Sequence, residues 1–256
     1  MDIKAYLDRI NYHGPVTVSP ENLRALQLAH LYAVPFENLS IHAGEPIVLE
    51  ERALFAKIVD QRRGGFCYEC NGLFAELLRA LGFQVDMLAA GVARPEGGFG
   101  QEFDHMTLMV TLADRWLVDV GFGDSFLEPL LLDARTDQTQ GTESFRLVDD
   151  DRRLILMRRT DGNWVPQYRF TLQPRGLSEY EVGSRFHQTS PESPFTKGLI
   201  CSRPTENGRI TLRNLRLITT HGVERHEETL PDRESFDQTL RDQFGVVMKN
   251  PPRFVD

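Results

Sequence analysis

The chain has 256 residues, of which 41% are hydrophobic and 26% charged, and its formal net charge is -8. This composition supplies a sizeable core and argues against a disordered chain. The acidic balance disfavours general binding to nucleic acid or to an anionic membrane, because such binding needs a basic face. The first residues lack the basic and apolar regions of a signal peptide, and no apolar run approaches the roughly 18 residues of a membrane span. We therefore expect a cytoplasmic protein.

The cysteine content agrees with that expectation. Three cysteines are too few for a disulfide framework in a chain of this length, and an odd number leaves at least one thiol free. Cysteine use of this kind is typical of a reducing compartment.

The first eighty residues predict four helices. Apolar side chains at helical spacing predict three of them, near residues 3–10, 54–59 and 73–81. The other starts at Ser19-Pro20-Glu21, which supplies an N-cap oxygen, a proline at the first helical position and an early acid. Gly82 is expected to end the last helix. Residues 1–83 are therefore predicted to form a helical bundle.

From about Phe83 the pattern changes to short strand-like runs separated by turn residues. The runs are 84–92, 105–112, 115–120, 144–148, 152–157 and 164–172. They predict an antiparallel sheet or barrel over residues 84–189. Strand-like runs at 209–219 and 223–230 follow, and then a helix from its N-cap Asp232 to Gly245. The last part, residues 190–256, is thus predicted to mix strands and a helix, and the expected fold class is α+β.

The segment RRGGFCYEC, residues 62–70, lies where a loop becomes the fourth predicted helix. Gly64 and Gly65 allow a close backbone approach and place Cys67 in the first helical turn. The helix N-terminus and the two arginines before it would both stabilise a thiolate, so we expect the Cys67 pKa below its usual value of about 8.5. A lone cysteine is more often a small buried hydrophobe, but this setting favours a nucleophile.

Cys67 and Cys70 also form a C-x-x-C motif, which suggests two other chemistries. A thioredoxin-like redox site should follow the first strand of a βαβ unit, whereas this motif follows predicted helices. A structural zinc site needs four ligands, and Cys201 with scattered histidines offers no second pair at short spacing. We therefore expect no metal, and we expect Cys70 to be a core residue.

A cysteine nucleophile needs a base, and the base needs an acceptor that orients it. His105 opens a predicted strand directly after Asp104. Asp119 is a carboxylate inside an otherwise apolar run, where a charge is costly unless it is paired. The other histidines lie near predicted helix ends or in polar loops: His13, His30, His42, His187, His221 and His226. Cys67, His105 and Asp119 are thus the candidate catalytic triad.

The register between the two strands decides whether His105 and Asp119 can meet. A two-residue turn at 113–114 would place Asp119 opposite Leu108, on the wrong face. A three-residue loop at 112–114 would place Asp119 opposite Thr107, on the same face as His105 and within reach of it. We predict the longer loop.

Together these motifs resemble the arylamine N-acetyltransferase family. The matching segments are PFENL at 35–39, RRGGFCYE at 62–69, DH at 104–105 and VDVGFG at 118–123. The resemblance implies a helical bundle with the cysteine, a β-barrel with the histidine and aspartate, and an α/β lid around a cysteine-protease-like core. It also implies ping-pong transfer of an acetyl group from acetyl-CoA, through an acetyl-cysteine, to the nitrogen of an arylamine, arylhydrazine or N-hydroxyarylamine.

The resemblance also implies roles for single residues. Cys67 would be acetylated, His105 would be the base, and Asp119 would orient it. Arg63 and Glu37 would pair to hold the cysteine loop. The remaining implied contacts are Phe36 and Phe122 in an aromatic acceptor pocket, and Gly121, Phe122 and Gly123 at the CoA pyrophosphate. From the residues alone, a Gly-Phe-Gly turn fits either a phosphate approach or an ordinary turn.

Two other functions fit the same residues. A papain-like or transglutaminase-like hydrolase also has Cys, His and Asp in this chain order. A catalytically silent small-molecule binding module could keep the fold. The physiological acceptor, the preferred acyl donor and the oligomeric state are left open by the sequence.

Overall fold

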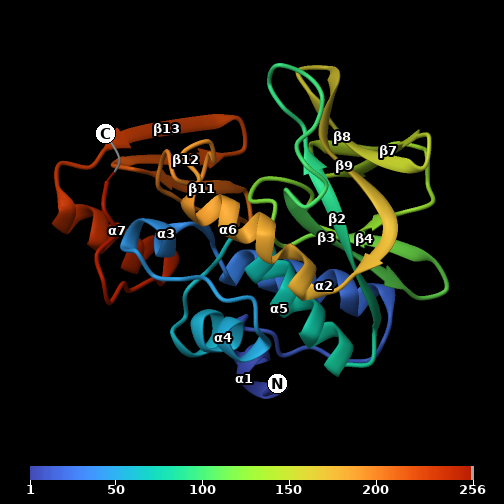
Figure 1. Cartoon of the computed structure of the whole chain (residues 1–256), viewed down its shortest axis with the longest axis horizontal. Coiled ribbons are helices and arrows are strands. Elements are labelled where there is room, and N and C mark those ends of the chain that lie inside the picture. The colour runs from blue at the N-terminus through green and yellow to red at the C-terminus, as the bar shows by residue number, and fades with distance from the viewer. Residues whose placement is uncertain (255–256) are drawn as a thin grey trace.

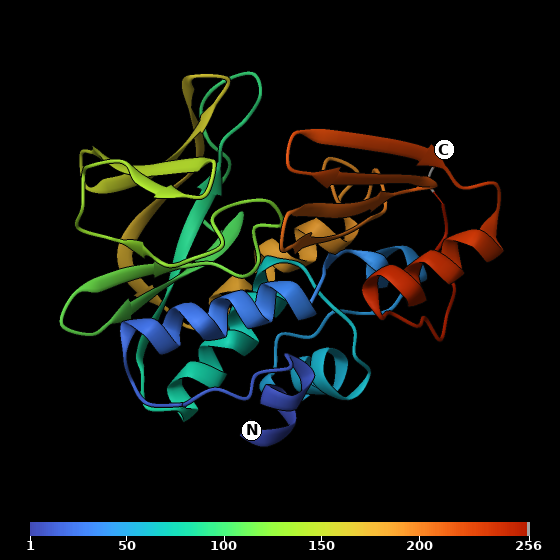
Figure 2. The same cartoon turned by 180° about the vertical axis from the view of Figure 1, so that it is seen from behind.

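The computed structural model describes residues 1–254 and has the α+β fold class that the sequence predicts. Helices from the first third of the chain form its base, and two separate sheets stand on this base (Figure 1). The same arrangement is seen from behind in Figure 2. No helix among the described residues combines the length and apolar character needed to cross a membrane. The division of the chain at residues 83 and 189 stays a prediction.

The four predicted N-terminal helices are present, together with a short helix, α3, that was not predicted. The helices are α1 (Ile3–Arg9), α2 (Pro20–Ala33), α3 (Leu39–Ala43), α4 (Glu51–Phe55), which continues into a π-helical turn (Ala56–Asp60), and α5 (Cys67–Ala80). Ser19 caps α2 by accepting a hydrogen bond from the Asn22 backbone N–H, as predicted. Gly82 follows α5 with a φ of 95°, a conformation that glycine adopts without strain.

The central strands curl into a nearly closed antiparallel barrel of eight strands, in the order β5-β4-β3-β2-β9-β8-β7-β6. Their bounds are β2 (Gln84–Val92), β3 (His105–Thr111), β4 (Arg115–Val118), β5 (Leu130–Leu131), β6 (Gln138–Gln140), β7 (Glu143–Asp150), β8 (Arg153–Thr160) and β9 (Asn163–Arg175). Six of these strands lie within a residue or a few of the predicted runs. The two shortest, β5 and β6, were not predicted, because two or three residues carry no readable alternation.

The predicted three-residue loop between β3 and β4 is confirmed. Thr111 pairs with Arg115 and Leu108 with Val118, so residues 112–114 form the loop. The same register places Asp119 opposite Thr107, and therefore on the face that carries His105.

The second sheet has five antiparallel strands in the order β1-β10-β11-β12-β13. They are β1 (Phe36–Glu37), β10 (Ile200–Thr205), β11 (Gly208–Arg213), β12 (Arg216–His221) and β13 (Glu224–Thr229). The prediction of one run over 209–219 was wrong: the chain turns at Asn214, whose φ is 49°, and β11 and β12 form a hairpin. The predicted last helix is confirmed as α7 (Arg233–Phe244), with Asp232 as N-cap and Gly245 as C-cap.

Two elements that shape the site were missed. They are β10 and α6 (Glu181–Thr189), which follows a short 3-10 helix (Leu177–Tyr180). Strand β10 contains Pro204. A proline normally argues against a strand, but this one lies beyond the two residues of β10 that pair with β1. The helix carries few apolar residues at helical spacing, because aromatic rings and buried hydrogen bonds anchor it instead.

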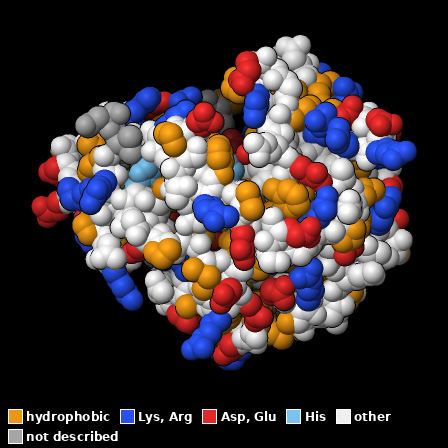
Figure 3. Space-filling model, in the orientation of Figure 1, with side chains coloured by type: hydrophobic (Ala, Val, Ile, Leu, Met, Phe, Trp, Pro, Cys, Tyr) orange, Lys and Arg blue, Asp and Glu red, His pale blue; other side chains and the backbone are white. Residues whose placement is uncertain are grey.

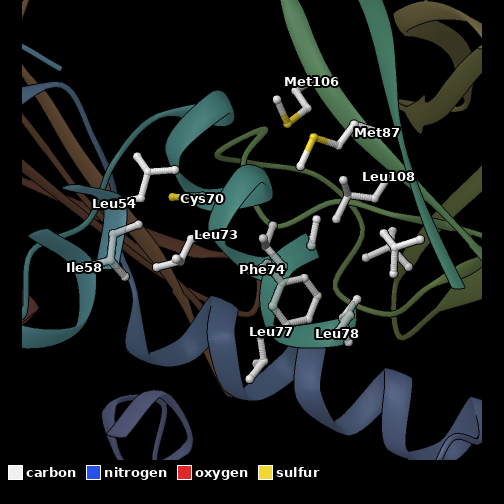
Figure 4. Packing of buried hydrophobic residues seen from close by; sticks show 14 of the residues in the cluster. Leu54, Ile58, Cys70, Leu73, Phe74, Leu77, Leu78, Met87, Met106 and Leu108 are labelled. Atoms are coloured by element: carbon white, nitrogen blue, oxygen red, sulfur yellow. The ribbon is translucent and has the colours of Figure 1, made fainter. Parts of the chain in front are cut away.

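Helix α5 lies at the centre of the main core. Its apolar side chains, among them Leu73, Phe74 and Leu77, lie between the other helices and strands β2 and β3 (Figure 4). Cys70 belongs to the same core, is fully buried, and its thiol donates a hydrogen bond to the Gly65 carbonyl over 3.2 Å. The expectation that Cys70 is a core residue is therefore confirmed. A helix held this firmly fixes the position of its first residue, Cys67.

Candidate active site

Cys67 is the first residue of α5, as predicted, and the turn before it is held by buried polar contacts. Glu69 reaches back to accept a hydrogen bond from the Phe66 backbone N–H over 3.1 Å. The Lys57 ammonium lies 2.6 Å from the other oxygen of Glu69. These contacts close the start of the helix and leave the Cys67 side chain on the wall of a cavity.

His105 and Asp119 form a buried pair, as the register requires. The Nε2 atom of His105 lies 2.7 Å from Oδ2 of Asp119, and both side chains are almost completely closed to solvent. Burial alone would raise the pKa of Asp119, but the His105 charge and hydrogen bonds from His105, Asn71 and Gly121 outweigh it and lower that pKa. Asp119 is thus held as a carboxylate facing the imidazole.

Asn71 connects this pair to the cysteine helix, and sequence reasoning missed it. It lies one helical turn after Cys67, and its Nδ2 donates to Asp119 over 2.9 Å and to the Met106 carbonyl over 2.7 Å. Its Oδ1 accepts a hydrogen bond from the Val120 backbone N–H over 2.8 Å. Its spacing of four residues from Cys67 was the available signal, since side chains at i and i+4 share a helix face.

Two aromatic rings fix the orientation of the His105 imidazole. The ring centroids of Phe122 and Tyr168 lie 5.2 and 5.0 Å from that of His105. The Tyr168 hydroxyl lies 3.2 Å from the Thr107 hydroxyl, beneath the pair. Tyr168, which sequence reasoning also missed, comes from β9, which pairs with β2 in the sheet, and it lies 61 residues later in the chain than Thr107.

The cavity has a volume of about 680 Å³, and both Cys67 and His105 line it. The predicted pocket residues Phe36 and Phe122 line it too, together with Gly121 and Phe195. A side chain at position 121 would place its Cβ 2.7 Å from the Cys67 Cα, so only glycine allows this approach. Gly123 lies beside the Phe36 ring. Phe36, Phe122 and Gly121 thus line one space next to the thiol, whereas Gly123 contacts Phe36 and is not itself a lining residue.

The expected low pKa of Cys67 is not found. Burial raises the pKa of the thiol well above its usual value, and the carboxylates of Asp119 and Asp104 raise it further, against hydrogen bonds from the backbone of Met106 and Tyr68. The two arginines do not offset this, because Arg63 is paired elsewhere and Arg62 is exposed. The surroundings of Cys67 therefore do not by themselves favour ionisation of the thiol.

Arg63 and Glu37 form the predicted pair, and it is fully buried. The guanidinium lies 2.8 Å from Glu37, whose second oxygen accepts a hydrogen bond from the Leu39 backbone N–H over 2.6 Å. Burial would raise the pKa of Glu37, but the charges of Arg63 and Lys57 lower it. The pair ties strand β1 to the cysteine loop. Across residues 1–254, no group of three or more His, Cys, Asp or Glu side chains is arranged to hold a metal ion.

Comparisons with known proteins agree with this geometry. The N-acetyltransferase family profile matches residues 19–253. The arylamine N-acetyltransferase of Mycolicibacterium smegmatis is 40% identical over 85% of this chain and 82% of its own. An arylamine N-acetyltransferase / N-hydroxyarylamine O-acetyltransferase of Salmonella typhimurium is 34% identical over 95% and 88%. The structure of Mycobacterium marinum arylamine N-acetyltransferase in complex with CoA superposes with a TM-score of 0.89 and 36% identity, over 96% of this chain and 93% of the other.

Proposed function

Because this chain belongs to the arylamine N-acetyltransferase family, we propose that it transfers an acetyl group from acetyl-CoA to the nitrogen of arylamines, arylhydrazines or N-hydroxyarylamines. The observation that carries the proposal is the buried His105–Asp119 pair beside Cys67, on a cavity lined by Phe36 and Phe122. Aromatic side chains are suited to hold an aromatic acceptor.

In this mechanism, His105 removes the proton from Cys67, and the thiolate attacks the carbonyl carbon of the acetyl thioester. Asp119 stabilises the imidazolium. It also keeps the neutral ring in the tautomer whose unprotonated nitrogen faces the thiol. The imidazolium then returns the proton to the CoA thiolate as it leaves. In the second half, His105 takes a proton from the amine that attacks the acetyl-cysteine, and Cys67 is released as a thiol.

The donor and acceptor would share the cavity in turn. Gly121, Phe122 and Gly123 form the proposed contact with the CoA pyrophosphate, since a backbone without side chains can approach phosphate closely. Phe36 and Phe122 form the proposed acceptor pocket. The Mycobacterium marinum relative was solved with CoA, which supports acetyl-CoA as the donor here. We also propose a cytoplasmic location, where acetyl-CoA is available and the three free thiols would stay reduced.

Intact mass spectrometry tests the proposal. After mixing with acetyl-CoA and no amine, the protein should gain one acetyl group, and an added arylamine should remove it. Cys67→Ser should not become acetylated and should retain its thermal unfolding midpoint, because the oxygen is a poor nucleophile but fits the site. Steady release of acetate to water would instead favour the hydrolase. Absence of any acetyl-protein, with iodoacetamide labelling Cys67 no faster than Cys201, would favour a binding module.

A further inference from the structure

A second histidine–carboxylate pair opens onto the same cavity. His187 lies on α6, and its Nε2 atom is 3.2 Å from Oδ1 of Asp104, the residue directly before His105. The His187 side chain is 3% exposed and that of Asp104 23%. Both residues line the cavity that Cys67 and His105 line. The cavity beside the thiol is therefore lined by one histidine from each of two histidine–carboxylate pairs.

The hydrogen bonds around His187 indicate which of its two ring nitrogens donates and which accepts. Ser193 Oγ accepts a hydrogen bond from the Phe195 backbone N–H, so its own proton is free for Nδ1 of His187, 3.1 Å away. The His187 Nε2–H then donates to the backbone carbonyl oxygen of Asp104, 3.2 Å away, and the same nitrogen lies 3.2 Å from the Asp104 carboxylate. This order satisfies both ring nitrogens of a neutral imidazole. The rings of Phe66, Tyr68 and Phe195 surround the imidazole and hold it in place.

The contact between His187 and Asp104 bears on Cys67 through the negative charge of the Asp104 carboxylate. The second carboxylate that acts on the thiol, Asp119, is engaged by His105 and Asn71. Asp104 accepts a hydrogen bond from the Val92 backbone N–H and is otherwise held by His187. A negative charge near a thiol opposes formation of the thiolate, and a hydrogen bond to that charge weakens the opposition. The other charged or titratable groups that face Cys67 or line the cavity are His105, Tyr68, Tyr180, Arg94, Glu96, Glu192 and Lys197.

We propose that Asp104 and His187 form a second pair that controls how readily Cys67 becomes a thiolate. His187 is a positioning residue: its Nε2–H is bonded to the Asp104 carbonyl oxygen and lies against the Asp104 carboxylate, so that it holds the carboxylate at the cavity wall and limits its repulsion of the forming thiolate. The inference rests on the proposed function only in treating Cys67 as the nucleophile. It assigns α6, which the sequence did not predict, a role in the chemistry as well as in the wall of the cavity.

Alkylation of Cys67 by iodoacetamide between about pH 5 and pH 10 tests this pair, with fragment ions separating Cys67 from Cys70. Asp104→Asn keeps the size of the side chain and one acceptor oxygen, which can still serve the Val92 backbone N–H, but removes the charge. Its alkylation profile should move to lower pH, with a rate at neutral pH about threefold to tenfold higher, since a tenfold change corresponds to one pKa unit. His187→Phe keeps the aromatic packing but cannot donate, and its profile should move to higher pH by a similar factor.

The double variant Asp104→Asn with His187→Phe should follow Asp104→Asn alone, because His187 acts through the carboxylate. His187→Gln, whose amide can still donate to Asp104, should restore most of the wild-type profile and serves as the second variant if His187→Phe does not fold. Glu102→Gln removes an exposed charge from the same loop and should leave the profile unchanged.

The proposal is overturned if Asp104→Asn leaves the profile in place while the protein stays folded. It is also overturned if His187→Phe slows alkylation equally in the presence and absence of the Asp104 charge. The assay needs neither acetyl-CoA nor an amine, so its failure is distinct from a failure to form the acetyl-protein.

Discussion

Asp119 is the residue on which the geometry of the site depends most directly. It is buried, ionised and in contact with His105, Asn71 and the Gly121 backbone N–H at distances of 2.7 to 2.9 Å. Its three partners come from strand β3, helix α5 and the glycine loop. One carboxylate thus joins the proposed base, the cysteine helix and the proposed donor contact.

Asp119→Asn should keep the shape of the site and remove its charge. The imidazolium of His105 would lose its stabilising partner, so acetylation of Cys67 should slow by roughly 10³- to 10⁴-fold, as for the corresponding change in serine protease triads. Rapid-mixing measurement of acetyl-protein formation checks this rate, and circular dichroism checks the fold. Near-normal acetylation in a folded variant would mean that Asp119 does not act through His105.

The sequence predicts which residues form the site better than it predicts how buried those residues are. The strand register and the cost of an unpaired carboxylate are enough to identify Asp119 from the order of the residues. Asn71 and Tyr168 could not be predicted in the same way, because Asn71 is an ordinary helix residue and Tyr168 reaches the site through the pairing of β9 with β2, strands far apart in the chain. The prediction of a low pKa for Cys67 was wrong because burial, which opposes ionisation, cannot be read from a helix N-terminus and two neighbouring arginines.

At the scale of elements, the Glu37–Arg63 pair fixes strand β1 against the cysteine loop. Arg63 also reaches Ser40 and Glu45, over 3.1 and 3.3 Å. Its backbone and that of Arg62 are held in turn by the guanidinium of Arg9, which donates to their carbonyl oxygens. The loop before Cys67 is therefore fixed from both sides by buried cations.

Arg63→Ala should destabilise the protein by about 3 to 5 kcal/mol, because it leaves the buried Glu37 carboxylate without its main partner. Urea unfolding at neutral pH measures the loss. Arg62→Ala is the matched control: its side chain is exposed and should change stability by less than about 0.5 kcal/mol. If Arg63→Ala unfolds like the wild type but loses activity, Arg63 takes part in catalysis instead of holding the loop.

Helix α2 contains a histidine whose burial makes the fold sensitive to acid. Burial, and then the nearby Arg9 charge, lower the pKa of His30 from 6.5 to about 3. Its Nδ1 lies 2.8 Å from the Tyr6 hydroxyl, and Nε2 has no hydrogen-bond partner among the described residues. His30 is thus neutral in the folded protein, whereas in the unfolded chain it binds a proton below about pH 6.5.

The resulting stability is complete above pH 6.5 and is lost as the pH falls toward 3, because the unfolded state binds the extra proton in this window. Between about pH 7 and pH 5 the loss should be about 2 kcal/mol. His30→Asn keeps an acceptor for Tyr6 but does not titrate, so its stability should fall less over this interval. Urea unfolding at both pH values checks the difference, and equal slopes for the two proteins would contradict it.

Helices and strands that are held mainly by contacts with distant parts of the chain could not be predicted from the sequence. Helices with an apolar stripe and a clear cap, such as α2 and α7, follow from the sequence. Helix α6 does not, because aromatic rings and the bonds of His187 and Gln188 hold it in place of a stripe. Strand β10 is positioned by pairing with β1, which lies more than 160 residues earlier in the chain. No local sequence pattern shows this partner.

Over the whole molecule, charged side chains of both signs are interspersed on the face shown in Figure 3, without a large patch of one sign. The two sheets and the helical base meet around the cavity, so its walls come from distant parts of the chain. Phe36 comes from β1, Phe122 from the loop after β4, and Phe195 from the segment after α6. The substrate site therefore depends on how these parts are joined.

Asn38 connects two of these parts. It is buried, its Nδ2 donates to the carbonyl oxygens of Phe195 and Gly198 over 2.9 and 2.7 Å, and its Oδ1 accepts from the Ile200 backbone N–H over 2.8 Å. Asn38 thus holds the segment that carries Phe195 to the cavity, together with His42, whose Nε2 lies 3.0 and 3.2 Å from the same two carbonyl oxygens. This contact spans about 160 residues, since Asn38 and Ile200 are 162 positions apart.

Asn38→Ala should cost about 1 to 3 kcal/mol of stability, because it leaves the Ile200 backbone N–H without its partner, while the Phe195 and Gly198 carbonyl oxygens keep His42. The loss should be local: amide hydrogen exchange at Ile200 and its neighbours should accelerate far more than exchange in α5. Since Phe195 lines the cavity, the KM for the aromatic acceptor should rise while the rate of Cys67 acetylation changes less. Asn163→Ala, in an exposed hairpin turn, is the control. A uniform acceleration of exchange with an unchanged KM would show that Asn38 stabilises the fold without shaping the acceptor wall.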